Sequence, residues 1–174
     1  KTPDTTMAAA SAPTDSSAMP MSPTMAKMTG DADHDFLRMM SDHHRGLIAI
    51  VHMTVDKKDI GSFMADAKKL DAAQDKELDQ MVSMLEKNYQ DPYEPKIMAE
   101  HQSMVDDLTG KSGKEFDRGF YADVIKHHEE ALTMIDTYLP NAKDAAVKRM
   151  AADMKAAQSR EITDFKGKLA KLGG

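Results

Sequence analysis

The sequence FLRMMSDHHRGLI, residues 36–48, returns in altered form as FYADVIKHHEEAL, residues 120–132. The offset between the two copies is 84 residues, so the two histidines at 43–44 match the two at 127–128. The same offset also relates Gln74 to Gln158, Glu77 to Glu161 and Leu85 to Leu169. A single offset that spans two successive stretches predicts a duplicated αα-hairpin.

Apolar side chains recur at three- and four-residue spacing on both sides of each histidine pair, which is the pattern of one helix face. With the Pro and Gly residues between such stretches, this pattern predicts helices over residues 33–57, 61–88, 95–108, 114–139 and 142–171. Aromatic residues make up only 5% of the chain and Trp is absent, which disfavours strand-rich folds. We therefore predict an all-α fold in which two hairpins form a four-helix bundle, with a short crossover helix between them.

The first 30 residues differ from the rest, because they contain no Leu, Ile, Val or aromatic residue. Such a segment cannot bury enough apolar surface to offset its loss of conformational entropy, so we predict a disordered Met-rich tail over 1–30. Residues 31–174 should form one bundle domain, with repeat one at about 33–88 and repeat two at about 114–172. Because the sequence starts with Lys1, we expect an exported, periplasmic protein from which a signal peptide has been removed.

Charge and cysteine content exclude several classes of function. The 23 basic and 29 acidic residues are interspersed, so no basic stripe is available for nucleic acid. No apolar run approaches the ~20 residues that a bilayer-spanning helix needs. The absence of cysteine excludes thiolate zinc sites, iron–sulfur clusters and thiol catalysis. A soft-metal site would have to use the 16 methionines and seven histidines.

Methionines and histidines share helix faces at several places. Met40 lies one helical turn before His44, which brings a thioether beside an imidazole. In the crossover segment, Met98, His101 and Met104 stand at three-residue steps on one face. The candidate metal ligands in the bundle are Met39, Met40, His43, His44, Met81, Met98, His101, Met104, His127, His128, Met134 and Met154, and those in the tail are Met19, Met21, Met25 and Met28.

Thioethers combined with imidazoles select copper, above all Cu(I), over cations that prefer oxygen, and silver should act as a mimic. Zinc also suits the histidine pairs. Two structural interpretations compete with a metal site. The histidines could instead form hydrogen bonds with the glutamines and glutamates of the repeat, and the helical methionines could fill irregular gaps in the core.

The segments FLRMMSDHHRGLI, residues 36–48, and QDKELDQM, residues 74–81, resemble the family known as domain of unknown function 305, which includes CopM-like copper-binding proteins. The resemblance covers about residues 33–172 and implies a ferritin-like helical bundle, export, and Met/His copper sites linked to copper resistance. It points to Met40, His43, His44 and Met81 in the first copy, and to His127 and His128 in the second. Val124 and Phe165 stand where Met40 and Met81 would recur, so the resemblance does not imply a symmetric second site.

Two other classes of function compete with copper binding. A di-iron oxidase on a ferritin-like bundle needs paired Glu-x-x-His motifs, whereas His127 and Glu130 have the reversed order and the position that matches Glu130 is Gly46. A metal-free helical interaction module is the other alternative. We expect a copper-sequestering or copper-buffering protein that is not an enzyme, with a copper donor or acceptor protein as its partner.

Overall fold

The computed structural model describes residues 28–55 and 63–173, and this part of the chain contains helices and no strands. The elements are α1 (Ala32–Val55), α2 (Met64–Tyr89), α3 (Ala99–Thr109), α4 (Gly113–Tyr138), the 3-10 helix η1 (Leu139–Asn141) and α5 (Ala145–Lys171). The predicted all-α fold is confirmed. The predicted disordered tail lies outside the described residues, apart from residues 28–30.

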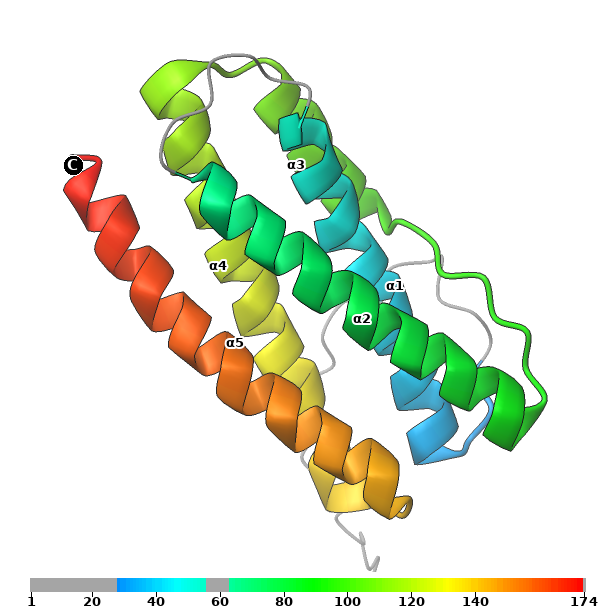
Figure 1. Ribbon diagram of the computed structural model, residues 1–174. Helices are drawn as coiled ribbons and strands as arrows, with labels where there is room; N and C mark the ends of the chain where they lie inside the picture. The colour runs from blue at the N-terminus through cyan, green and yellow to red at the C-terminus, as the bar shows by residue number, and fades with distance from the viewer. Residues whose placement is uncertain (1–27, 56–62, 174) are drawn as a thin grey trace, which may run out of the picture.

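The four long helices form a bundle of two antiparallel pairs (Figure 1). Helix α2 packs along α1, and α5 packs along α4. The two pairs meet through α1 and α4, while the short α3 packs mainly on α1. An extended connection, green at the right of Figure 1, runs from the end of α2 back along the bundle to α3.

The crossover helix begins at Ala99, later than the predicted start at 95. The segment DPYEP, residues 91–95, is extended because its prolines disfavour helical conformation in the preceding residues. Asp42 of α1 holds this connection in place. Its carboxylate accepts hydrogen bonds from the Tyr93 hydroxyl at 2.7 Å and from the Lys96 backbone N–H at 2.8 Å.

Two apolar clusters form the core. One contains the aromatic residues Phe63, Phe116, Phe120, Tyr121 and Phe165. The other contains the buried methionines Met40, Met81 and Met154, together with Phe36 and Tyr138. Burial of these side chains against one another supplies the main driving force for bundle formation.

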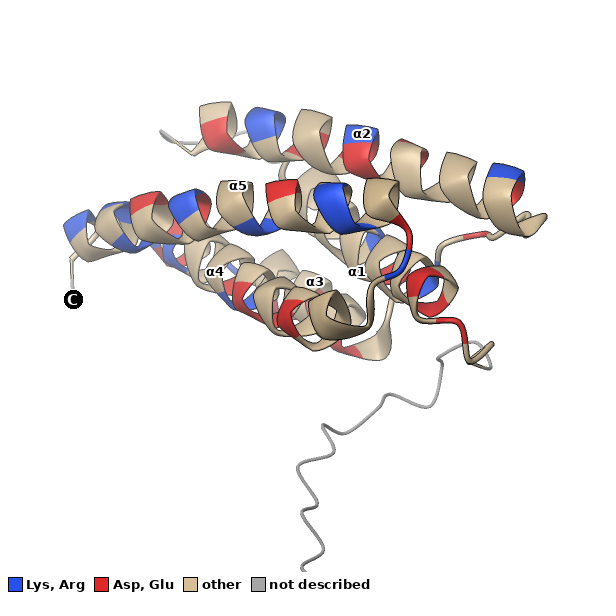
Figure 2. Ribbon diagram, turned by 90° about the horizontal axis from the view of Figure 1, so that it is seen from below, with Lys and Arg blue, Asp and Glu red and all other residues tan. Residues whose placement is uncertain are grey.

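The exposed faces of the bundle carry both signs of charge. Basic and acidic residues alternate along α2 and α5 in Figure 2, so neither helix presents a face of a single charge. Within the described residues, no helix combines the length and the apolar character that crossing a membrane requires.

Asp33, near the start of α1, is bonded to the connection between α4 and α5. Its buried carboxylate accepts hydrogen bonds from the hydroxyl of Tyr138 and from the backbone N–H groups of Lys143, at 3.2 Å, and Asp144, at 2.9 Å. Burial raises the pKa of this carboxyl, but the hydrogen bonds outweigh it and hold the pKa below 3.8. The ionised carboxylate therefore joins the two helix pairs.

We predict that Asp33→Ala lowers the free energy of unfolding at neutral pH by about 1–3 kcal/mol, because buried donors lose their acceptor. Because the pKa of Asp33 is lowered on folding, the difference between parent and variant should be constant above the ordinary aspartate pKa and should shrink as the pH falls below 3.8. Urea unfolding of the parent and of Asp33→Ala at several pH values measures this difference in the free energy of unfolding. Asp79→Ala, at an exposed position of α2, is the control, and an equal effect in both variants would contradict the prediction.

Candidate metal centre

A layer of buried polar side chains separates the two apolar clusters. On α1 this layer lies between Met40 of one cluster and Leu47 of the other, and on α4 it lies between Ala131 and Val124. Helices α2 and α5 each add a buried glutamine, and α3 adds a histidine. The members of this polar layer, each at most 2% exposed, are His43, His44, Gln74, His101, His127, His128 and Gln158.

Three histidines of the polar layer, one each from α1, α3 and α4, form a single group that we term the histidine cluster. One ring nitrogen from each of His43, His101 and His127 lies within 4.8 Å of the other two. The ring centroids are 3.7 Å apart for His43 and His127, 4.8 Å for His101 and His127, and 5.1 Å for His43 and His101. Three imidazoles from separate helices thus converge on one point in the interior.

The hydrogen bonds around the cluster leave several imidazole lone pairs free to bind a ligand. Nε2 of His127 lies 2.8 Å from the backbone carbonyl oxygen of His43. A carbonyl oxygen only accepts, so Nε2 carries the proton and Nδ1 of His127 presents a lone pair. Within the described residues, this Nδ1 and both ring nitrogens of His43 and His101 have no hydrogen-bond partner. Buried polar atoms in that state cost about 1–3 kcal/mol each, unless something else satisfies them.

Gly46 makes room for the third histidine. A Cβ atom added at this position would lie 2.0 Å from Nδ1 of His101, far inside van der Waals contact. Glycine also lies one turn after His43, so the ring of His101 fits against α1 directly beside that of His43. A glycine in the middle of a helix is unfavourable by about 1 kcal/mol relative to alanine, so its presence here has a packing reason.

The other two histidines of the polar layer have carboxylate partners. Nε2 of His44 lies 2.8 Å from a carboxylate oxygen of Glu77, and Nε2 of His128 lies 2.8 Å from one of Glu161. These two pairs are related by the 84-residue offset. The contact of His44 is a hydrogen bond, as the structural interpretation of the sequence expects, whereas Nε2 of His128 lies close to Glu161 without the geometry of a hydrogen bond.

One carboxylate stands at the edge of the histidine cluster. An oxygen of Glu130 lies 3.9 Å from Nε2 of His43 and 3.9 Å from Nε2 of His101, beyond hydrogen-bond length. The interaction with His101 lowers the pKa of Glu130 despite its partial burial. Its negative charge would favour a cation bound among the three rings.

Burial and mutual repulsion favour the uncharged form of two rings of the cluster, those of His43 and His127. Burial lowers the pKa of His43 well below 6.5, and the neighbouring His101, His44 and His128 lower it further. Burial also lowers the pKa of His127 well below 6.5, with added contributions from His43 and His101. Neutral imidazoles are the form that binds metal ions.

The methionines that the sequence proposes as ligands lie in several places. Met40, Met81 and Met154 are buried in one apolar cluster, Met134 packs against that cluster, and Met104 belongs to the other. Met39 and Met98 are half-buried, and Met28 is 49% exposed. Met19, Met21 and Met25 lie outside the described residues.

The sequence proposed consecutive histidine pairs and a separate set around His101, whereas the structure groups one histidine from each of these three sets. The sequence reasoning missed this grouping. The available signal was Gly46, a glycine one turn after His43 in an otherwise well-formed helix. A second group of possible ligands, which the sequence reasoning also missed, lies at the surface, where His52, Asp71 and Asp75 bring ligand atoms within 4.8 Å of one another.

We predict that the metal-free protein loses stability as the pH falls below about 6.5. The pKa values of His43 and His127 are lowered in the folded state, so the unfolded chain binds more protons in this pH range. Proton binding therefore stabilises the unfolded state relative to the folded state. Each histidine contributes up to about 1.4 kcal/mol per pH unit between its folded and unfolded pKa values. Urea unfolding in the presence of a chelator between pH 7.5 and 5 measures the slope, which should be smaller in His43→Ala. A parent and variant with the same slope would show that the ring of His43 is not held neutral.

Solved structures of other proteins share this fold. A fragment of a DUF305 protein from Deinococcus radiodurans is 24% identical, with a TM-score of 0.71, over 80% of this chain and 96% of its own. CopM in its Cu(II)-bound form is 23% identical, with a TM-score of 0.70, over 81% of this chain and 97% of its own. CopM in its Cu(I)-bound form is 24% identical, with a TM-score of 0.70, over 82% of this chain and 98% of its own. A DUF305 protein from Streptomyces coelicolor, described as a candidate secreted protein, is 20% identical, with a TM-score of 0.74, over 83% and 94%.

A comparison with curated proteins found no significant sequence match. The family model described as Domain of unknown function (DUF305), by contrast, matches residues 2–85 and 33–169. The two matches together extend over nearly the whole chain and include all three members of the histidine cluster. The chain therefore belongs to the DUF305 family.

Proposed function

We propose that this protein binds copper at the histidine cluster. The observation that carries the proposal is the convergence of the buried His43, His101 and His127, whose rings include nitrogens that have no hydrogen-bond partner in the described residues. Three imidazole nitrogens are a common ligand set for transition metals, and Cu(II) has the highest affinity among the first-row divalent ions. Cu(I) also accepts imidazole ligands.

The related structures favour copper over zinc as the ion. CopM, which shares the fold over most of this chain, has been solved in Cu(II)-bound, Cu(I)-bound and silver-bound forms. The silver bound by CopM is a soft monovalent ion, as Cu(I) is. A site built for zinc has no need to accept such an ion. We therefore assign Cu(I) and Cu(II) as the ions that this chain holds, with silver as a mimic of Cu(I).

The wider role follows from this assignment and is part of the proposal. We propose that the protein sequesters or buffers copper without turnover, contributes to copper resistance, and is exported to the periplasm. The Streptomyces coelicolor relative, a candidate secreted protein, supports export. A ferritin-like di-iron oxidase would need four carboxylates around one site, whereas among residues 28–55 and 63–173 the carboxylate found beside the histidine cluster is that of Glu130.

We also propose that the bundle arose from a duplicated hairpin of ferritin-like type. Support comes from pairs at equivalent positions. His44 with Glu77 and His128 with Glu161 have the same separation of 2.8 Å and the same sequence offset. The buried glutamines Gln74 and Gln158 have that offset too.

We predict that Cu(II) raises the melting temperature of the parent protein, because an ion that binds only the folded state stabilises it by mass action. His43→Ala and His101→Ala should each lose most of this rise. His52→Ala should keep it, since His52 is exposed and outside the cluster. Thermal unfolding with and without Cu(II) measures the shift within each variant, so any change in metal-free stability cancels. Loss of the shift in His52→Ala alone would move the site to the surface group.

A glycine substitution tests the geometry of the cluster without removing a ligand. Gly46→Ala should displace the ring of His101, lower the metal-free melting temperature and weaken copper binding. In the His101→Gly background, which removes both the ring and the Cβ atom that a new Cβ at position 46 would meet at 2.8 Å, the same substitution should stabilise the protein by up to about 1 kcal/mol, because alanine favours the helix. The opposite signs form a double-mutant cycle that urea unfolding can measure. The same sign in both backgrounds would refute close packing of His101 on Gly46.

A further inference from the structure

A groove of about 1040 Å³ runs between α2 and α5, away from the histidine cluster. It exists because α2 packs along α1 and α5 along α4, so the flanks of α2 and α5 that border the groove are not covered by those partners. Both helices lie at the front of the bundle in Figure 1. The groove is open to solvent.

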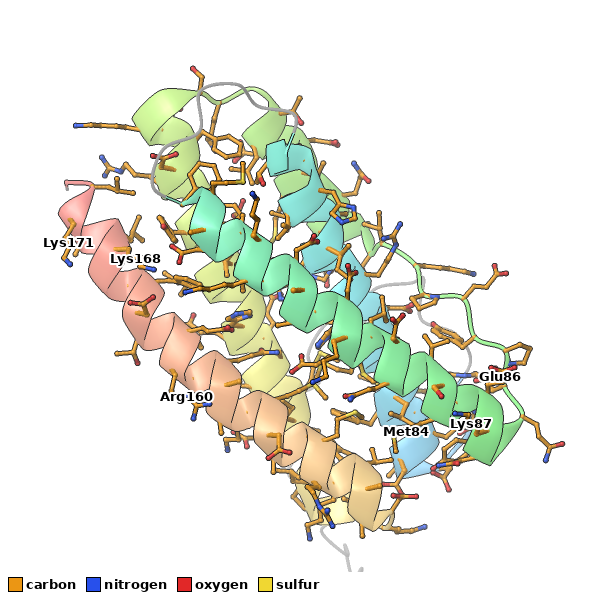
Figure 3. The ribbon with its side chains drawn as sticks, in the orientation of Figure 1. Met84, Glu86, Lys87, Arg160, Lys168 and Lys171 are labelled. Atoms are coloured by element: carbon orange, nitrogen blue, oxygen red, sulfur yellow. The ribbon has the colours of Figure 1, made fainter. Side chains whose placement is uncertain are left out.

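Three methionines line this groove. Met84 comes from the C-terminal part of α2 (Figure 3), and Met150 and Met154 come from α5. Met150 and Met154 are four residues apart, so both lie on one face of α5. Met84 and Met150 are half-buried, whereas Met154 is 1% exposed. Methionines from two helices thus line the same groove, with Met154 buried and Met84 and Met150 partly exposed.

Core packing accounts for only part of this arrangement. All three methionines pack against the apolar cluster that also contains Met81. A buried methionine such as Met154 can serve as core filler. Met84 and Met150, in contrast, present part of their surface to an open groove, where flexible side chains gain little from packing.

The groove also carries carboxylates. The acidic residues that line it are Glu77, Asp79 and Asp153. The basic residues Lys76 and Arg149 line it too. Glu77 also contacts His44 at 2.8 Å, so the groove borders the outer edge of the polar layer. Neutral sulfur ligands discriminate against cations that prefer oxygen, and the nearby carboxylates offset a single positive charge.

We propose that Met84, Met150 and Met154 form a second site, specific for a soft monovalent cation of the Cu(I) or Ag(I) type. The site rests on the proposed copper-binding function only for the identity of its ion, since its ligands share no residue with the histidine cluster. A sulfur-only site holds Cu(I) and excludes Cu(II) and zinc, which the imidazoles of the cluster accept. The groove thereby adds a position for soft monovalent ions alone, whereas the cluster takes both oxidation states of copper.

The test is a titration of the full chain, labelled with [methyl-¹³C]methionine, with Ag(I). The methyl resonances of Met84, Met150 and Met154, assigned by single substitutions to Leu, should shift together. The double variant Met84→Leu/Met150→Leu, nearly volume-conserving, should keep the fold but lose the Ag(I)-induced shift of Met154. Met134→Leu is the matched control, because Met134 packs against the same cluster without lining the groove, and it should change nothing.

A second arm separates this site from the histidine cluster. In His43→Ala the groove methionines should still respond to Ag(I), even though copper stabilisation is lost. Absence of a shift at the three methionines in the parent would overturn the groove site and leave the cluster untouched. If Met84→Leu/Met150→Leu unfolds, the two single variants are titrated instead, and a full Met154 shift in both would overturn the proposal.

Discussion

The imidazole ring of His101 occupies the space where a side chain at position 46 would lie. Because that residue is glycine, α3 can approach α1 closely enough to add its histidine to those of α1 and α4. The repeat places Glu130 at the position that matches Gly46, so one copy leaves room for a ring and the other provides a carboxylate. The carboxylate then stands 3.9 Å from both His43 and His101. The shape and the charge of the cluster both depend on this single difference between the copies.

Continuous apolar packing would be the more stable way to fill the bundle, since burial of polar groups is unfavourable unless they are paired. The polar layer interrupts that packing at the level where all four long helices contribute. Glutamates lie beside two of its outer members, at 2.8 Å from His44 and 2.8 Å from His128. In the cluster, both ring nitrogens of His43 and of His101 have no hydrogen-bond partner within the described residues, and these atoms are the basis of the proposed ligand-binding role.

The helices could be predicted from the sequence because their periodicity and the 84-residue offset are visible in it. The grouping of the histidines could not, because consecutive residues on a helix point about 100° apart. His43 therefore meets α3 and α4, while His44 meets Glu77 of α2. The methionines near His101 in the sequence have other surroundings, because Met98 precedes α3 with an extended backbone and Met104 belongs to an apolar cluster. Linear spacing identifies candidate residues, but the tertiary register decides which of them share a site.

The origin of the cluster in three different helices determines how long a bound ion would stay. Helix α3 has 11 residues, and a helix of that length is marginal unless it is docked on the rest of the protein. It packs mainly on α1, at the glycine that admits His101. Detachment of α3 alone would remove one donor of three while α1 and α4 stay packed. The residence time of a bound ion would then depend on the rate at which the shortest helix undocks, and a partner that binds α3 could accelerate release without unfolding the bundle.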